Sequence, residues 1–176
     1  MAEIEEVYRW EKFRLEIFIR CARQEAFDAW ASASGIQRWF RKDVRVSRNG
    51  RELNSVSKFE AGDEMQWADF VGQELTKSRI LSVMPGVSIK QTFENEKVWL
   101  TNEVRPSGNG VVLTLTQENM PIDENGKAAW HLSCCAGWTF FLTNLKSVLE
   151  NKIDLRGQGP ETTFQVAKYI YDETWK

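Results

Sequence analysis

The sequence predicts an α+β fold in which a curved antiparallel β-sheet wraps around a long C-terminal helix. Between residues 43 and 119, short strand-like segments are separated by turn residues such as Asn49-Gly50 and Pro85-Gly86. From residue 126 to about 153, aromatic and aliphatic residues recur at spacings of three and four, which is typical of a helix with one apolar face. An antiparallel sheet with one apolar face must cover that face, and this helix is the available cover.

The other elements follow from local patterns. Residues 13–20 alternate apolar and polar side chains, which predicts a half-buried strand. Residues 23–40 predict two short helices with a break near Ser34-Gly35. Further strands are expected at 43–46, 55–59, 64–70, 73–84, 87–93, 97–104 and 111–119. The connections between them are short, so neighbouring strands are expected to be antiparallel.

Length and composition indicate one globular domain. We expect residues 1–156 to form the domain and residues 157–176 to form a C-terminal extension, a short helix that begins near Pro160. A net charge of −2 and a pI of about 5.6 argue against a general nucleic-acid binder. Eight tryptophans and ten phenylalanines are many for 176 residues, and such rings fill a core or leave gaps that another apolar molecule can occupy.

No segment of the sequence predicts export or membrane insertion. The N-terminus is acidic and has no apolar stretch typical of a signal peptide. No apolar run approaches the roughly 20 residues of a membrane span. Three cysteines form no disulfide framework. A cytoplasmic location is therefore expected.

Four stretches carry a resemblance to a known family: ARQEAFDAWASASGIQRWF, FEAGDEMQW, GNGVVLTLTQENMP and CCAGWTFFLTNLKSVLE. Together they resemble the START-like, or Bet v 1-like, superfamily, and within it proteins homologous to the C-terminal domain of the activator of Hsp90 ATPase. The resemblance spans about residues 11–156 and implies a helix-grip fold with a cavity between sheet and helix. Many relatives carry a histidine three residues before the Gly-Trp pair of the last helix, where this chain has Cys134.

His131, Cys134 and Cys135 raise the question of a metal site, a redox pair or a catalytic pair. Adjacent helical side chains diverge by about 100°, so the three cannot converge on one point. His131 and Cys135 do share a face, but free cysteine is among the most buried residue types. We therefore interpret the cluster as part of a buried helix face, and we expect no catalytic residue, no metal and no cofactor.

The expected interior is lined by rings and a few amides. Strand alternation places Gln91, Asn102 and Gln117 on the same faces as the apolar residues, where they could orient a ligand. The alternative is a solid core in which these amides bond to backbone or water. Gly137 serves either close helix–strand approach or space over a cavity. The candidate ligand-binding residues are Trp39, Met65, Trp67, Gln91, Phe93, Leu100, Asn102, Gln117, Cys134, Trp138 and Phe141.

A basic run, Arg38 to Arg51, holds six basic residues against one acid. It is either a solvated face or a contact for an anionic partner, such as a chaperone or another acidic protein surface. Three functions remain open. The first is non-enzymatic binding of a small hydrophobic or aromatic molecule, the second is a co-chaperone-like module acting on an Hsp90-type ATPase, and the third is a cyclase- or aromatase-like enzyme. For the third, the sequence offers no acid–base pair.

Overall fold

The computed structural model describes residues 8–68 and 75–156, which fold as a curved antiparallel sheet packed on a long helix. The strands are β1 (Lys12–Ile19), β2 (Val44–Arg48), β3 (Arg51–Glu52), β4 (Glu64–Ala68), β5 (Leu75–Met84), β6 (Ser88–Phe93), β7 (Asn95–Ser107) and β8 (Gly110–Glu118). Their order across the sheet is β1-β8-β7-β6-β5-β4-β2-β3. The predicted α+β helix-grip fold is confirmed.

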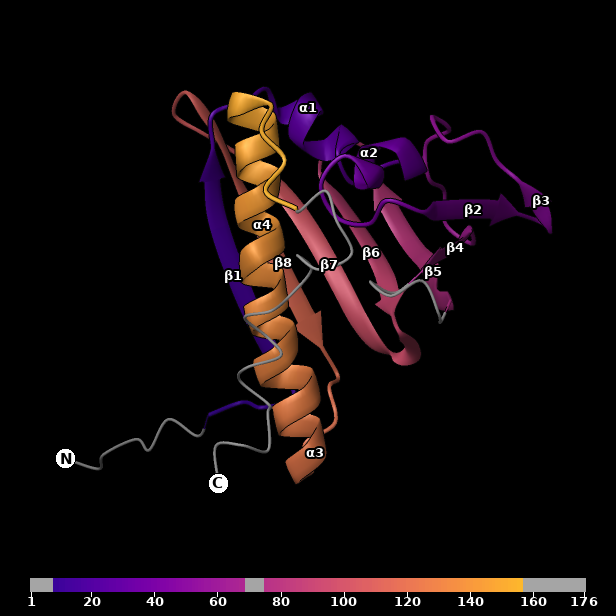
Figure 1. The fold of residues 1–176 in the computed structure, drawn as a ribbon, viewed down its shortest axis with the longest axis vertical. Coiled ribbons are helices and arrows are strands. Elements are labelled where there is room, and N and C mark those ends of the chain that lie inside the picture. Colours follow the sequence, from indigo (N-terminus) through magenta and orange to yellow (C-terminus); the bar gives the residue numbers. More distant parts are fainter. Residues whose placement is uncertain (1–7, 69–74, 157–176) are drawn as a thin grey trace.

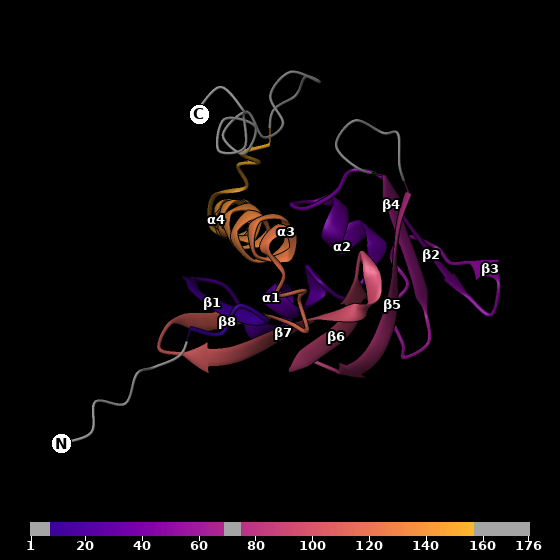
Figure 2. The same ribbon diagram turned by 90° about the horizontal axis from the view of Figure 1, so that it is seen from below.

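The helices are α1 (Arg23–Asp28), α2 (Ala33–Gln37), α3 (Glu124–Gly126), the π-helix η1 (Lys127–Leu132) and α4 (Ser133–Asn151). Seen end-on, α4 lies on the concave side of the sheet (Figure 2). The short helices α1 and α2 lie near the C-terminal end of α4 and close that end of the fold (Figure 1). None of the helices in the described ranges is long and apolar enough to span a membrane.

The break between the two short helices was predicted in the wrong place. It falls between Asp28 and Ala33, and Gly35 lies inside α2. The Ser32 hydroxyl accepts a hydrogen bond from the Gly35 amide at 3.1 Å and so caps α2. A β-carbon at Gly35 would collide with the Asp28 carbonyl oxygen. The glycine therefore permits close approach of the two helices instead of ending one of them.

Two strand predictions also differ from the structure. Residues 55–59 form no strand; Phe59 is instead buried, and its amide donates to the Ala31 carbonyl at 2.9 Å. Strand β7 continues past the predicted turn at Pro106 to Ser107. Pro106 lies beyond the part of β7 that pairs with β6, so its missing N–H removes no bond between those strands. The predicted segments at 69–74 and 157–176 lie outside the described residues.

The long helix matches the prediction except at its two ends. It ends at Asn151, and its beginning contains the π-helix, which the apolar spacing did not indicate. Polar side chains of α4 form hydrogen bonds with the end of β1. Lys146 Nζ donates to the Phe18 carbonyl at 2.5 Å, and Glu150 accepts from the Arg20 amide at 2.7 Å. The buried face of α4 comprises Trp138, Phe141, Leu142, Asn144, Leu145, Val148 and Leu149.

Candidate functional site

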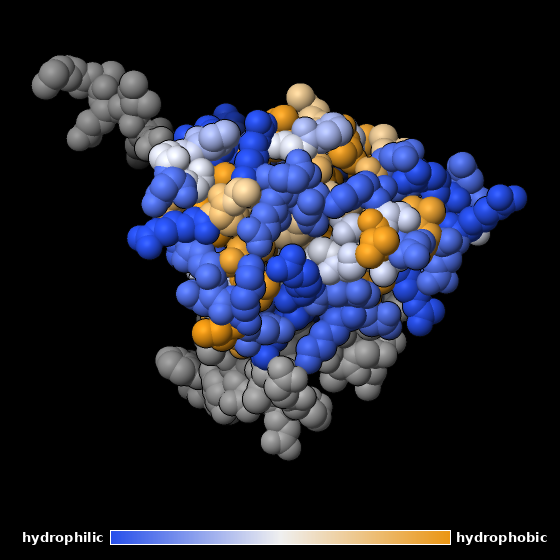
Figure 3. All heavy atoms as spheres, turned by 90° about the horizontal axis from the view of Figure 1, so that it is seen from above, coloured by the Kyte–Doolittle hydropathy of each residue, from blue (hydrophilic) through white to orange (hydrophobic). Residues whose placement is uncertain are grey.

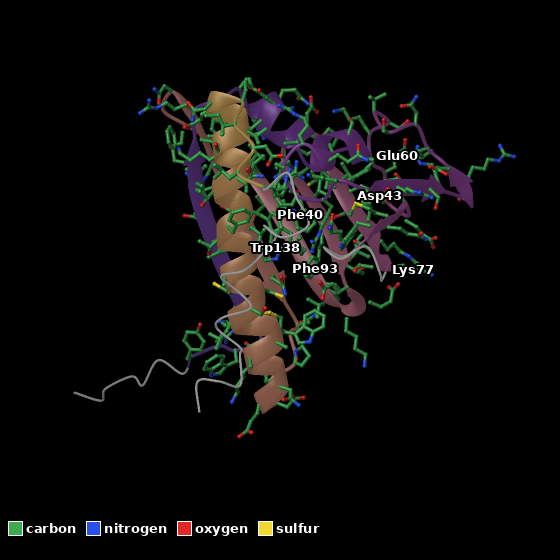
Figure 4. The ribbon with its side chains drawn as sticks, viewed as in Figure 1. Phe40, Asp43, Glu60, Lys77, Phe93 and Trp138 are labelled. Carbon is green, nitrogen blue, oxygen red and sulfur yellow. The ribbon has the colours of Figure 1, made fainter. Side chains whose placement is uncertain are left out.

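A cavity of about 260 Å³ lies between α4 and the end of β6. Its lining residues are Phe40, Arg41, Phe93, Glu94, Ala129, Ser133, Cys134, Gly137, Trp138 and Phe141. Phe40, Phe93 and Trp138 come from three separate segments, and their side chains lie together beside the helix (Figure 4). The volume is close to the lower end of the range of small-molecule pockets.

Phe93 lies on the inner face of β6 with Ile89 and Gln91, and a β-bulge at this end of the strand buries Thr92 as well. The β6–β7 register shifts between Thr92 and Phe93, and both residues are buried although they are adjacent. Hydrogen bonds fix the bulge: Thr92 Oγ1 accepts from the Arg79 amide at 2.8 Å, and the Ser78 hydroxyl donates to the Thr92 carbonyl. The side chain that departs from alternation is therefore Thr92, as is common at a bulge.

Aromatic rings form the largest part of the wall. Phe40 stacks on Trp138 with ring centroids 4.9 Å apart and an interplanar angle of 22°. Phe93 lies 5.3 Å from Trp138, and Phe141 meets Phe40 edge-on at 4.6 Å. The Trp138 indole donates to Gln117 Oε1 at 2.8 Å, which fixes the orientation of the indole ring. The wall is therefore rigid and suits a flat apolar guest.

Two charged residues join this aromatic wall. The Arg41 guanidinium lies over the Phe40 ring at 4.7 Å and over the Phe141 ring at 5.6 Å, measured to the ring centroids. Glu94 is the turn residue between β6 and β7 and adopts a left-handed backbone with φ of 60°. Desolvation raises the pKa of the Glu94 carboxyl, and the nearby Arg41 opposes that shift.

Cys134 lines the cavity as a neutral thiol. Burial is the main cause that raises its pKa to about 12, so it is protonated at neutral pH and is no thiolate nucleophile there. Burial also raises the pKa of Cys135.

The only histidine of the chain is not paired with a cysteine. His131 Nε2 lies 2.6 Å from the Tyr8 hydroxyl, and Nδ1 lies 2.9 Å from the Trp10 carbonyl oxygen. Both ring nitrogens are thus used to hold the segment before β1 against the π-helix. Within residues 8–68 and 75–156, no group of His, Cys, Asp or Glu is arranged to hold a metal ion.

The predicted ligand-binding residues divide into two groups. Phe93, Cys134, Trp138 and Phe141 line the cavity. The rest are buried but absent from that wall: Trp39, Met65, Trp67, Gln91, Leu100, Asn102 and Gln117. Trp39 faces Trp30, at 4.3 Å between ring centroids, and donates to the Ala29 carbonyl at 2.9 Å. Contact of either group with a ligand stays a prediction.

Sequence reasoning missed Phe40, Arg41, Glu94, Ala129 and Ser133. Because Trp39 and Phe40 are adjacent, periodicity does not show which of the two side chains faces the cavity. Glu94 was predicted to be a turn residue. Ala129 and Ser133, two small residues before Gly137 on the helix, carried no distinguishing spacing. In hindsight, an arginine directly after the Trp-Phe pair was the available signal, because it joins a charge to a ring cluster.

Two amides, Asn102 and Gln117, are buried in the sheet, and Gln117 bonds to Trp138 of the cavity wall. Asn102 is 2% exposed, and neither its side-chain oxygen nor its nitrogen has a protein partner. The Nε2 atom of Gln117 has none either. Asn102 pairs with Leu115 in the register and Gln117 with Leu100, so the two amides are diagonal neighbours on one face of β7 and β8. Buried amides in this state are satisfied by water or by a guest.

Gly137 faces open space. A β-carbon built there would meet no heavy atom within 4 Å. Of the two expected uses, the structure thus favours clearance over the cavity.

The fold places the basic residues between Arg38 and Arg51 in different surroundings. Arg41 joins the cavity wall, and Arg48 pairs with Asp63 and Glu60. The exposed members include Arg38, Arg45 and Arg51, and Arg45 lies 3.7 Å from Asp43. The face of the molecule seen from above is mainly hydrophilic, with apolar residues scattered among charged ones (Figure 3).

The fold and the cavity together define a helix-grip domain with a pocket between sheet and C-terminal helix. The model of the family described as "Activator of Hsp90 ATPase homolog 1-like protein" matches residues 20–150, so the chain belongs to that family. No curated protein sequence matches it.

Solved structures share the fold at low sequence identity. The Aha1 dimer from Colwellia psychrerythraea has 14% identity and a TM-score of 0.63, and the match covers 80% of this chain and 96% of that one. The protein SSP2350 from Staphylococcus saprophyticus has 18% identity and a TM-score of 0.66, with 83% and 96% covered. The protein MLL2253 from Mesorhizobium loti has 16% identity and a TM-score of 0.64, with 82% and 99% covered.

Proposed function

We propose that this domain binds a small, largely apolar molecule in the cavity between α4 and the end of β6, without a chemical step. The observation that carries the proposal is the open space at Gly137 within an aromatic wall. A glycine in a helix interior costs about 1 kcal/mol relative to alanine. A β-carbon would fit at this position, so an alanine would make the helix more stable. A bound guest in the open space explains why the position is a glycine.

The chemistry of the wall supports binding over catalysis. The Cys134 thiol is protonated at neutral pH, and His131 is held by Tyr8 and Trp10. The aromatic rings provide a flat apolar surface, and the amides of Asn102 and Gln117 provide polar atoms behind it. A few fixed polar groups within an apolar wall are typical of small-molecule sites.

A Gly137→Phe variant is expected to stay folded and to bind a neutral aromatic probe, 2-naphthol, at least about tenfold more weakly than the unmodified protein, because the new ring occupies the cavity. Gly137→Ala is expected to keep binding and to gain about 0.5–1 kcal/mol of unfolding free energy, because alanine suits a helix better. Ligand-detected NMR measures the binding, and urea denaturation measures the stability.

Ala136→Phe is the matched control, because Ala136 is the exposed neighbour of Gly137 on the same helix. It adds the same ring outside the cavity and is expected to leave binding unchanged. Equal binding by the Gly137→Phe and Ala136→Phe variants would place the probe elsewhere and contradict the proposal.

A second candidate is a co-chaperone-like module that acts on an Hsp90-type ATPase, which the description of the matching family favours. The exposed arginines Arg38, Arg45 and Arg51 would meet an acidic surface of such a partner. The support is weaker, because Arg41 and Arg48 are engaged within the fold.

This candidate predicts a higher ATPase rate when the cognate chaperone is saturated with the protein. The increase should fall with added salt and be lost when Arg38, Arg45 and Arg51 are all changed to glutamate. An unchanged rate at saturation would exclude the co-chaperone function.

A further inference from the structure

The charged residues at the cavity restrict which apolar molecules can bind there. This inference about the guest rests on the function proposed for the same site. The faces of Phe40 and Phe141 are the places where a cationic guest would sit. The Arg41 guanidinium already lies over both rings, at 4.7 Å and 5.6 Å from their centroids. A second cation placed there would be repelled, so the wall disfavours amines and quaternary ammonium compounds.

The same guanidinium suits the opposite charge. Arginine carries five N–H donors in a planar fork that matches the two oxygens of a carboxylate, so it can hold one alongside its other interactions. Arg41 lines the cavity next to the stacked pair of Phe40 and Trp138, whose ring centroids are 4.9 Å apart. A flat guest with an acid group at one end would place its ring against these side chains and its acid on Arg41.

We propose that the cavity selects a small aromatic monocarboxylate, with its ring against Phe40 and Trp138 and its carboxylate bonded to Arg41. The cavity volume of about 260 Å³ has room for roughly ten non-hydrogen atoms at the packing density of protein interiors. That size fits one ring with a short acidic side chain.

Glu94 makes this selection depend on pH. Among the described residues, Arg41 from the loop after α2 and Cys134 from α4 act electrostatically with the Glu94 carboxyl. Desolvation raises the pKa of Glu94, while Arg41 lowers it. Above that pKa the ionised Glu94 repels an anionic guest and competes for Arg41; below it the neutral acid does neither. Binding of a carboxylate is therefore strengthened as pH falls, until the guest itself is protonated.

The test compares trans-cinnamate with cinnamamide, which have the same shape and differ in charge. The unmodified protein is expected to bind cinnamate about tenfold more tightly than the amide, since a hydrogen bond to a charged group exceeds a neutral one by about that factor. Arg41→Gln is expected to abolish the preference, and Arg41→Lys to give an intermediate one, because lysine keeps the charge but loses the two-point contact. Ligand-detected NMR titration gives both dissociation constants, and their ratio is insensitive to a general loss of folding.

Glu94→Gln provides a second readout. At about pH 8 it is expected to bind cinnamate more tightly than the unmodified protein, and the difference should narrow as pH falls towards the raised pKa of Glu94. Equal binding of cinnamate and cinnamamide by the unmodified protein would overturn the inference and leave the proposed function intact. Binding of 2-naphthol but of neither of these compounds would overturn the inference alone, and binding of none of the three would overturn both.

Discussion

A Trp138→Ala variant is expected to lose about 3–5 kcal/mol of unfolding free energy, the usual cost of truncating a large buried aromatic side chain. Trp138 is 3% exposed and contacts the rings of Phe40, Phe93 and Phe141. Its loss would leave a large void where α4 faces the sheet. Urea denaturation followed by circular dichroism measures the change.

Trp138→Phe separates the ring from its N–H group. It keeps most of the packing but removes the donor to Gln117 Oε1, which now accepts at 2.8 Å. The buried Gln117 Oε1 atom would then lose its donor. The expected cost is about 1–3 kcal/mol. A loss below about 1 kcal/mol for Trp138→Ala would contradict the packing described at this interface.

The second large effect concerns the ion pair between Arg48, the last residue of β2, and Asp63, which directly precedes β4. Asp63 is 0% exposed, and Arg48 binds both of its carboxylate oxygens, with Nε–Oδ1 at 2.7 Å and Nη2–Oδ2 at 2.9 Å. The Glu60 amide also donates to Asp63 Oδ2 at 2.8 Å. Arg48→Met is expected to cost about 3–5 kcal/mol at neutral pH, because it leaves a buried carboxylate without its cation.

The loss should depend on pH in a definite direction. Burial alone would raise the pKa of Asp63, but the hydrogen bonds from Arg48 and Glu60 outweigh it and lower the pKa. The pair therefore stabilises the fold above about pH 4, the value of an unfolded aspartate, and this contribution is lost as pH falls through the lowered pKa. Without Arg48, Asp63 is protonated more readily, so the stability difference between the two proteins should shrink on acidification.

Two further variants check the cause. Adding Asp63→Asn to Arg48→Met removes the stranded charge and is expected to recover part of the stability. Arg48→Lys keeps a charge but loses the two-point contact, so it should fall between the unmodified protein and Arg48→Met. A stability loss that is the same from about pH 7 to about pH 4 would show that packing, not charge, is responsible.

Regular periodicity explains which parts of the fold could be predicted. Alternation in the strands identified Met65, Trp67 and Leu100 as buried, and the helical spacing identified Trp138 and Phe141. These assignments need only the period of one element. The curved sheet and its helical cover follow from the same patterns, since each apolar face requires a partner.

The rest depended on places where the period is interrupted. Thr92 is buried beside the predicted Phe93 because a bulge breaks the alternation. Arg41 and Glu94 lie in loops between secondary-structure elements. In loops, the direction of a side chain is set by tertiary contacts and not by the periodicity of a helix or strand. The partners of His131 lie more than a hundred positions earlier in the chain, at Tyr8 and Trp10, so no local pattern could indicate them.

The π-helix at Lys127–Leu132 separates two halves of the long helix that have different neighbours. A π turn takes one residue more than an α turn, so it offsets the angular phase of the residues before it from that of the residues after it. The part before Ser133 can therefore contact the N-terminal segment through His131 and the cavity through Ala129, while the part after it packs on the sheet side through Trp138 and Phe141. A residue inserted or deleted within Lys127–Leu132 would therefore turn His131 and Ala129 relative to Trp138 and Phe141, and would disturb the N-terminal contact and the cavity together.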